Sequence, residues 1–176
     1  MSIERRVINL TQLKWLNIKE AIDPNLGVKG FQFAERKGVD SVAFIGLDTD
    51  RDEFILTNEY LPPLDIFLDR AFGGSLDNDN FSPIEITQME IQEEAGYKVE
   101  LDDIVYLGKV FVSSMMNQFC HLFIFFANDS LKCERTTDDP IEKMATIRRI
   151  PLSEINSLED WKAITIVSKY KNNKVK

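Results

Sequence analysis

Three glutamates, Glu90, Glu93 and Glu94, stand close together near the middle of the chain. On a helix, at about 100° per residue, Glu90 and Glu94 lie one turn apart on one face, with Glu93 beside them. Like charges at this spacing destabilise a bare helix by about 0.2–0.5 kcal/mol per pair. A hard cation held by oxygen ligands would offset that repulsion. A solvated acidic surface is the simpler interpretation of the helix alone, so other residues must decide between the two.

Residues 82–96 carry signals for both ends of such a helix. Ser82 is a favoured N-cap, Pro83 suits the first helical position, and Glu85 completes a capping box. Gly96 stands where a left-handed C-cap residue is expected. The sequence therefore predicts one short helix that carries all three glutamates.

The helix follows the glycine pair at positions 73 and 74, which we interpret as a turn that feeds it. Apolar stretches on either side predict strands over 41–47 and 53–59, joined as a hairpin, and over 104–113 and 119–127. A further strand is predicted over 142–151, and a last helix over 158–170 with Trp161, Ile164 and Val167 turned inward. Strands, helix, strands and helix in this order favour a mixed sheet with helices packed on its faces.

The stretch Met89–Tyr97 resembles the second half of the box of the Nudix hydrolases, which runs Arg-Glu-apolar-x-Glu-Glu-x-Gly-apolar. The first half departs from that box. The interval after Gly74 is one residue longer than the pattern, and Asn80 or Phe81 stands where its first Glu belongs. Met89 also replaces the Arg, so the box is degenerate at two places.

Residues outside the box resemble the ADP-ribose pyrophosphatase branch of the Nudix hydrolases. In that branch an early strand ending in Glu precedes a hairpin and a Gln-x-Arg-x-Pro motif. This chain has Phe33–Glu35, then the hairpin from Ser41, then Glu59–Pro63, in which Leu61 replaces the Arg. The layout extends from about Trp15 to the last helix.

This resemblance implies an α/β (α+β) Nudix fold, a mixed sheet sandwiched between helices with a small N-terminal β subdomain. The domains would be residues 1–39, which carry two or three short strands, and 40–176. In the branch such N-terminal strands commonly pack across a two-fold axis and help to form the substrate pocket. We therefore expect a homodimer, in which Trp15 and Phe31 would have something to pack against.

The resemblance also implies that Glu90, Glu93 and Glu94 hold Mg²⁺ or Mn²⁺, and that Glu93 or Glu94 helps to activate water. The carbonyl of Gly73 would be a further ligand, as the corresponding backbone oxygen is in relatives. A general base often comes from an acidic loop after the box, although an ordinary polar loop explains the same residues. The candidates for this base are Asp138, Asp139 and Glu142.

Composition narrows the class of protein. A chain of 176 residues with 44% hydrophobic residues is long enough for one sizeable core. The formal net charge of −8 argues against binding to nucleic acid or an anionic membrane. Two cysteines and one histidine give little support to a zinc finger or a disulfide framework, and no segment resembles a signal peptide or a membrane span. We expect a cytoplasmic protein.

The leading hypothesis is a Mg²⁺-dependent hydrolase that cleaves the pyrophosphate of a nucleoside diphosphate linked to another group, such as ADP-ribose or a nucleotide sugar. The alternative is a catalytically impaired Nudix-fold module that binds such a nucleotide or has a regulatory role, which Phe81 and Met89 favour. His121 alternates with apolar neighbours and is interpreted as structural. The diphosphate could meet Arg36, Arg51 or Arg70.

Overall fold

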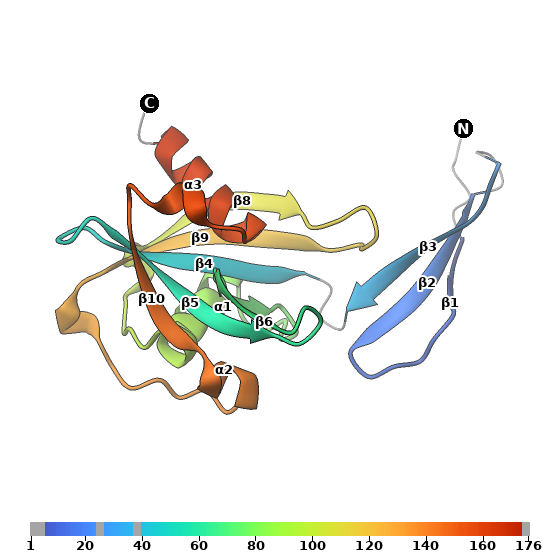
Figure 1. Cartoon of the computed structure of the whole chain (residues 1–176). Helices are drawn as coiled ribbons and strands as arrows, with labels where there is room; N and C mark the ends of the chain where they lie inside the picture. The colour runs from blue at the N-terminus through green and yellow to red at the C-terminus, as the bar shows by residue number, and fades with distance from the viewer. Residues whose placement is uncertain (1–5, 24–26, 37–39, 174–176) are drawn as a thin grey trace.

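The chain forms two β-sheets with helices on the larger one (Figure 1). The computed structural model describes residues 6–23, 27–36 and 40–173. The smaller, antiparallel sheet contains β1 (Arg6–Asn9), β2 (Leu16–Asp23) and β3 (Val28–Arg36). The larger sheet contains β4 (Ser41–Asp48), β5 (Glu53–Leu61), β6 (Ile66–Arg70), β7 (Phe72–Ser75), β8 (Ile104–Phe111), β9 (Phe119–Ala127) and β10 (Thr146–Pro151).

The helices are short except for the last one. The two that matter most for the site are α1 (Pro83–Glu90), which continues as the π-helix η2 (Ile91–Ala95), and α2 (Pro140–Met144). The others are η3 (Leu101–Asp103), η4 (Asp129–Leu131), η5 (Ile155–Ser157) and α3 (Trp161–Asn173). No helix in the described part of the chain is long and apolar enough to cross a membrane.

The larger sheet is mixed, as the sequence predicts. Its strand order is β10-β5-β4-β9-β8, with β6 beside β5 and β7 beside β4. Strands β4 and β9 pair in parallel, and the other pairs described in this sheet are antiparallel. Strand β4 changes partner along its length, from β7 at Ser41–Phe44 to β5 at Gly46–Asp48. The predicted fold class is confirmed.

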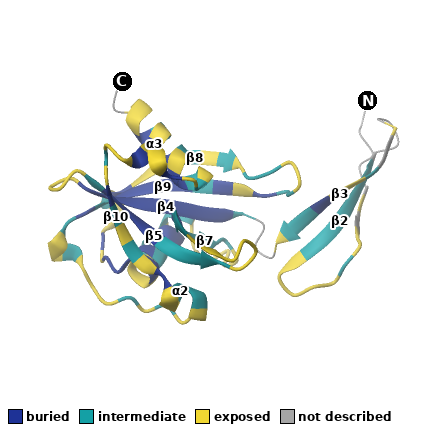
Figure 2. Ribbon diagram, viewed as in Figure 1, coloured by how far each residue is buried: buried dark blue, intermediate teal, exposed yellow. Residues whose placement is uncertain are grey.

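Both faces of β4 are covered, so every residue of this strand is buried (Figure 2). Successive side chains point to opposite faces of a strand. Val42 and Phe44 therefore pack with residues of α1 and η2, whereas Ala43 and Ile45 pack with residues of α3. The two core clusters on opposite sides of one strand fix α1 and α3 on opposite faces of the sheet.

The end of β3 contacts the loop that connects β8 and β9 of the larger sheet. The N–H of Ala34 donates to the carbonyl of Met115 at 2.7 Å, and the Asn117 amide donates to the Glu35 carboxylate. Three strands are present, in agreement with the two or three predicted. The domain boundary expected between residues 39 and 40 involves residue 39, which lies outside the described residues.

The strand predicted over 142–151 is wrong in its first part, because residues 140–144 form the helix α2 and the strand begins at Thr146. Asp139 caps this helix, since its Oδ1 atom accepts a hydrogen bond from the N–H of Ile141 at 2.7 Å. Pro140 occupies the first turn. A cap followed by proline starts a helix, and the local pattern outweighed the apolar run that suggested a strand.

The final helix begins at Trp161 rather than residue 158, and of the three residues predicted to point inward only Val167 is buried. Its buried residues are Ala163, Ile166, Val167 and Tyr170. Trp161 and Ile164, which were predicted to point inward, are 39% and 45% exposed. The start is set by Asp160, whose Oδ2 atom accepts a hydrogen bond from the N–H of Ala163 at 3.1 Å.

The predicted glycine turn is also wrong, because Gly73 and Gly74 lie inside strand β7. They pair with Ala43 and Val42 of β4. Strand β7 thus stands where a turn was predicted, and β6 (Ile66–Arg70) precedes it directly. Both glycines are needed for close approach to neighbouring atoms rather than for a tight turn, as the site shows.

Candidate active site

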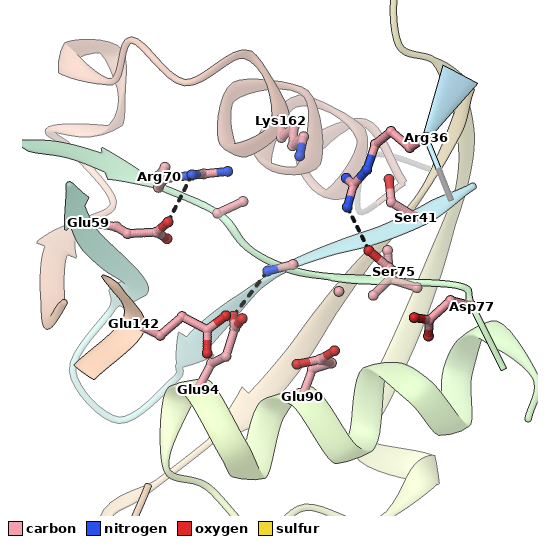
Figure 3. Close-up of a pocket in the computed structure, with 14 residues that line it drawn as sticks. Arg36, Ser41, Glu59, Arg70, Ser75, Asp77, Glu90, Glu94, Glu142 and Lys162 are labelled. Carbon is pink, nitrogen blue, oxygen red and sulfur yellow. Dashed lines mark hydrogen bonds and ion pairs between the residues drawn. The ribbon is translucent and has the colours of Figure 1, made fainter. Parts of the chain in front are cut away.

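A cleft of about 360 Å³ opens beside β7 and the acidic helix. It collects residues from β3, β5, β6, β7, α1, η2, α2 and α3, which are far apart in the sequence (Figure 3). Its lining is Arg36, Ser41, Val42, Glu59, Arg70, Ala71, Gly73, Gly74, Ser75, Asp77, Glu90, Glu94, Glu142 and Lys162. Glu90, Glu94 and Glu142 lie on one side of the cleft, which we call the acidic side (Figure 3). Arg36, Arg70 and Lys162 lie on the other, basic side, where Glu59 forms an ion pair with Arg70.

Glu94 is the most deeply placed of these carboxylates, with 9% of its surface exposed. Its Oε2 atom accepts a hydrogen bond from the N–H of Gly73 at 3.2 Å. Burial raises the pKa of Glu94 to about 9, and the charges of Glu90 and Glu142 add to this effect. Burial, followed by the charges of Glu93 and Glu142, raises the pKa of Glu90 to about 7.

The helix that carries these residues begins and ends as the sequence predicts. The Glu85 carboxylate accepts hydrogen bonds from the N–H and the hydroxyl of Ser82, at 2.8 and 2.6 Å. Gly96 ends the helix in the left-handed region, with φ 72°. These two local signals fix the ends of the segment from residue 83 to 95.

The interior of the helix differs from the prediction at Glu93. Residues Ile91–Ala95 form a π-turn, which is wider than an α-turn. The wider turn changes the angle between successive residues, and Glu93 is exposed and does not line the cleft. Its charge still contributes to the raised pKa of Glu90. Glu90 and Glu94 remain together there, so the structure brings two of the three predicted glutamates into the cleft.

The glycines of β7 allow the helix to come close. A Cβ atom on Gly74 would lie 2.2 Å from Oε1 of Glu90, and one on Gly73 would lie 2.9 Å from the carbonyl oxygen of Val42. Any larger residue would displace a neighbour. Gly73 lines the cleft, and its N–H donates to Glu94, while the role of its carbonyl as a metal ligand stays a prediction.

The loop after the box contributes Glu142, which lines the cleft from α2. Its carboxylate accepts a hydrogen bond from the hydroxyl of Thr137. Asp139, the other candidate base, does not line the cleft and instead caps α2 with its side chain. Asp138 lies at the surface, where its carboxylate is 3.5 Å from the Lys143 ammonium.

Three basic side chains face the acidic side (Figure 3). The Arg36 Nη2 atom donates to the Ser75 hydroxyl at 2.7 Å, and Arg70 lies 3.2 Å from the Glu59 carboxylate. Lys162 projects from the first turn of α3. Of the three arginines considered from the sequence, Arg36 and Arg70 thus line the cleft. The third, Arg51, binds Asp48 and Asp129 elsewhere.

Lys162 was not among the predicted site residues, because no motif near it in the sequence relates it to the box. The available signal is Asp160, an N-cap residue two positions before it. The Asp160 carboxylate accepts hydrogen bonds from the N–H groups of Ala71 and Ala163, at 2.9 and 3.1 Å. It therefore fixes the start of α3 to the junction of β6 and β7, next to Arg70.

The only histidine in the sequence, His121, lies outside the cleft lining. Its Nδ1 atom is 3.2 Å from the Tyr106 hydroxyl, and its Nε2 atom is 4.0 Å from the Asp40 carboxylate. Burial lowers the pKa of this imidazole. The side chains of Phe81 and Met89, which stand where the box pattern has Glu and Arg, are also outside the cleft lining and are 43% and 39% exposed.

The chain is similar in fold to a known hydrolase. A solved structure described as the crystal structure of an ADP compounds hydrolase matches it with a TM-score of 0.77, over 97% of this chain and 92% of that one. The chain shares the fold of that hydrolase. The sequence identity is 14%, so this similarity concerns the fold. No protein-family model matches the chain, and no curated protein matches it by sequence.

The acidic side of the cleft offers oxygen ligands for a cation. In the described ranges, no group of three or more Asp, Glu, His or Cys residues could by itself hold a metal ion. Mg²⁺, however, is usually bound by one or two carboxylates together with substrate phosphates and water. Glu90 and Glu94 are buried or half-buried carboxylates with raised pKa values, and their oxygen atoms fit a hard cation of this kind.

Proposed function

We propose that the protein is a hydrolase, dependent on Mg²⁺ or Mn²⁺, that cleaves the pyrophosphate of a nucleoside diphosphate linked to another group. The observation that carries this proposal is the division of one cleft into an acidic side and a basic side. A diphosphate bound with a divalent cation presents both charges and so complements both sides. The ADP compounds hydrolase of the same fold supports ADP derivatives as the first substrates, with ADP-ribose and nucleotide sugars foremost.

The basic side would bind and orient the diphosphate. Arginine binds phosphate oxygens with two parallel hydrogen bonds, and lysine binds them as a point charge. Arg36 is held by Ser75, and Arg70 is held beside Glu59, so both guanidinium groups are placed before substrate arrives. Lys162 completes this side from α3.

The acidic side would hold the cation through Glu90 and Glu94. When bound, Mg²⁺ or Mn²⁺ supplies a charge that polarises a phosphate oxygen and lowers the pKa of water. Without a cation, burial and mutual repulsion keep a proton on Glu94 at neutral pH, since its pKa is raised to about 9. Binding of a cation would therefore compete with this proton.

Glu142 is the residue that we assign as the general base. Its carboxylate lies in the cleft and is oriented by the Thr137 hydroxyl. Glu142 would take a proton from the attacking water while the oxygen of that water forms a bond to phosphorus. The bond between phosphorus and the bridging oxygen breaks, and the second phosphate leaves with that oxygen.

The alternative function is a module that binds such nucleotides without cleaving them. The departures of the box at Phe81 and Met89 favour it, because both are exposed side chains where the pattern carries charge. Both functions use the basic side of the cleft. They differ in whether Glu94 and Glu142 take part in chemistry.

The experiment is a panel of nucleoside diphosphate derivatives incubated with Mg²⁺ or Mn²⁺, followed by phosphatase treatment and measurement of phosphate. Cleavage of at least one ADP derivative by the wild type, lost in Glu142→Gln, supports the hydrolase. Binding of ADP-ribose by calorimetry with no cleavage under any condition would support the binding module instead. A protein that neither binds nor cleaves any compound of the panel would contradict both proposed functions.

We further propose that the protein works as a homodimer. The smaller sheet leaves large apolar side chains exposed, among them Leu16 at 43% and Phe31 at 48%. A three-stranded sheet needs something to pack against. A second copy of the chain, related by a two-fold axis, is the partner that the proposal names.

A further inference from the structure

The segment 131–137 lies between η4 and α2 in the chain. It crosses the end of η2, which with α1 forms the helix that carries Glu90 and Glu94 (the glutamate-bearing helix). Two backbone hydrogen bonds fasten it there. The N–H of Cys133 donates to the carbonyl of Gly96 at 2.9 Å, and the N–H of Thr136 donates to the carbonyl of Glu93 at 3.2 Å. The loop that leads to Glu142 is therefore attached to the helix that carries Glu94.

Arg135 continues this attachment to α2. Its Nη1 atom donates to the carbonyl of Ala145, and its Nη2 atom donates to the carbonyl of Glu142, both at 2.8 Å. Carbonyls at the end of a helix lack partners within the helix. The Glu142 carbonyl also accepts the N–H of Ala145, whereas one guanidinium group contacts both carbonyls and so holds the end of a helix that is only five residues long.

The stem of Arg135 rests on Gly96. A Cβ atom at Gly96 would lie 3.0 Å from the Cγ atom of Arg135 and 3.0 Å from the carbonyl oxygen of Cys133. Gly96 also has a φ of +72°, which a side chain would strain. The absence of a side chain at Gly96, which ends the glutamate-bearing helix, therefore also leaves room for the side chain of Arg135.

The placement of the Arg135 guanidinium group leaves one of its nitrogen atoms without a hydrogen bond. The Nε atom of Arg135 is buried and has no hydrogen-bond partner among the described residues. A buried donor without a partner is unfavourable and calls for an explanation. Here the explanation is the position of the other two nitrogens, which reach Glu142 and Ala145 together.

From these contacts we infer that Arg135 is a positioning residue, which holds α2 against the end of the glutamate-bearing helix and so sets where the Glu142 carboxylate lies relative to Glu94. This inference rests on the proposed function of the cleft for its kinetic consequence. The coupling itself is a property of the fold. Arg135 acts through Glu142 and lies outside the cleft lining.

The kinetic test is a double-mutant cycle with Arg135→Ala and Glu142→Gln. We expect Arg135→Ala to lower kcat about 10- to 100-fold and to change KM little. This is the range for residues that orient a functional side chain without contacting the substrate. Arg135→Lys should restore part of kcat, because an ammonium group can reach one carbonyl. In the Glu142→Gln background, Arg135→Ala should cause no further loss. Losses that multiply in the double variant would overturn the inference.

The matched control is Lys132→Ala. Lys132 lies on the same segment, is exposed, and pairs with Asp129 at 2.7 Å. Its loss should leave kcat unchanged. If Arg135→Ala does not fold, Arg135→Lys carries the test: it should lower kcat in the parent and have no effect in the Glu142→Gln background.

A second measurement separates this inference from the proposed function, because it requires no substrate. The N–H groups of Lys143 and Ala145 are bonded within α2, to Asp139 and Glu142. Hydrogen exchange at these amides should rise several-fold in Arg135→Ala, with exchange in β4 unchanged. Unchanged exchange in α2, or an equal rise in β4, would overturn the inference even if the protein proves to cleave nucleotides.

Discussion

Glu90 lies so close to Gly74 that a Cβ atom on residue 74 would fall 2.2 Å from the Glu90 Oε1 atom. The contact joins a strand backbone to the end of a flexible side chain. We expect Gly74→Ala to leave the fold intact but to move the Glu90 carboxylate out of its place. Mn²⁺ affinity, measured by calorimetry, should fall about 10-fold or more, while Tm changes by only a few degrees.

The control for this prediction is Gly27→Ala. Gly27 has nothing within 4 Å of the position where its Cβ would lie, although its φ of +65° makes alanine strained there. Backbone strain at Gly27 should lower Tm slightly without any effect on Mn²⁺ affinity. Unaltered Mn²⁺ affinity in Gly74→Ala would contradict the role given to Glu90.

A second prediction concerns pH. The pKa of Glu94 is raised to about 9 in the folded protein, from 4.5 in the unfolded chain. Its contribution to stability is therefore fully present below pH 4.5 and is lost as pH rises towards 9. Glutamine cannot ionise and still accepts the N–H of Gly73. Glu94→Gln should therefore raise Tm at pH 8 in the absence of divalent cations and have little effect at pH 4.5.

The same melts with added Mn²⁺ provide the comparison. A cation that binds only the folded state stabilises it by an amount that grows with the logarithm of the cation concentration relative to Kd, so Mn²⁺ should raise the Tm of the wild type at pH 8. The increase should be absent in Glu94→Gln. An equal increase in both proteins would show that Mn²⁺ binds elsewhere.

A third prediction concerns the attachment of α3. Asp160→Ala removes the acceptor for the N–H groups of Ala71 and Ala163. The loss of the helix cap costs about 0.5–2 kcal/mol, and leaving the N–H of Ala71 without its partner adds about 1–3 kcal/mol. Urea unfolding should show this loss. Glu159→Ala, at the exposed neighbouring position, should unfold as the wild type does.

Asp160→Ala should also weaken substrate binding. Without the Asp160 carboxylate, the start of α3 with Lys162 is no longer held to Ala71, which lies between β6 and β7 beside Arg70. Asp160→Asn keeps one acceptor oxygen and should recover part of both properties. A variant that loses stability but binds ADP-ribose as tightly as the wild type would argue against Lys162 as part of the basic side.

The helix with Glu90 and Glu94 could be predicted because its signals are local. The Ser82–Glu85 capping box and Gly96 specify its ends within the chain itself. The strands of the hairpin and β9 follow from apolar runs, which mark buried strands wherever their partners lie. Glu142 was among the candidates because acidic loops after a box are part of the resemblance.

What could not be predicted depends on contacts between distant residues. Lys162 reaches the cleft only because Asp160 binds Ala71, which lies 89 residues away. Glu93 leaves it because the helix widens into a π-turn, a feature without a simple sequence signal. Gly73 and Gly74 suggest a turn locally, and they are explained in a strand by the close approach of the Val42 carbonyl to Gly73 and of Glu90 to Gly74.

A fourth prediction tests the homodimer. Light scattering at micromolar concentration should give twice the mass of one chain, and deletion of residues before Asp40 should give a monomer. Phe31→Lys places a charge on the exposed apolar face of the smaller sheet and should also favour the monomer. An intact protein that is monomeric at this concentration would contradict the proposal.

The most direct test of the central claim is the rate of ADP-ribose hydrolysis with Mg²⁺ in the wild type, Glu94→Gln and Glu93→Gln. Glu94 lies in the cleft and Glu93 lies outside its lining, although both belong to the same acidic helix. We predict that Glu94→Gln loses at least about 100-fold in kcat/KM, and that Glu93→Gln retains far more of the activity. Equal rates in the wild type and Glu94→Gln would contradict the account.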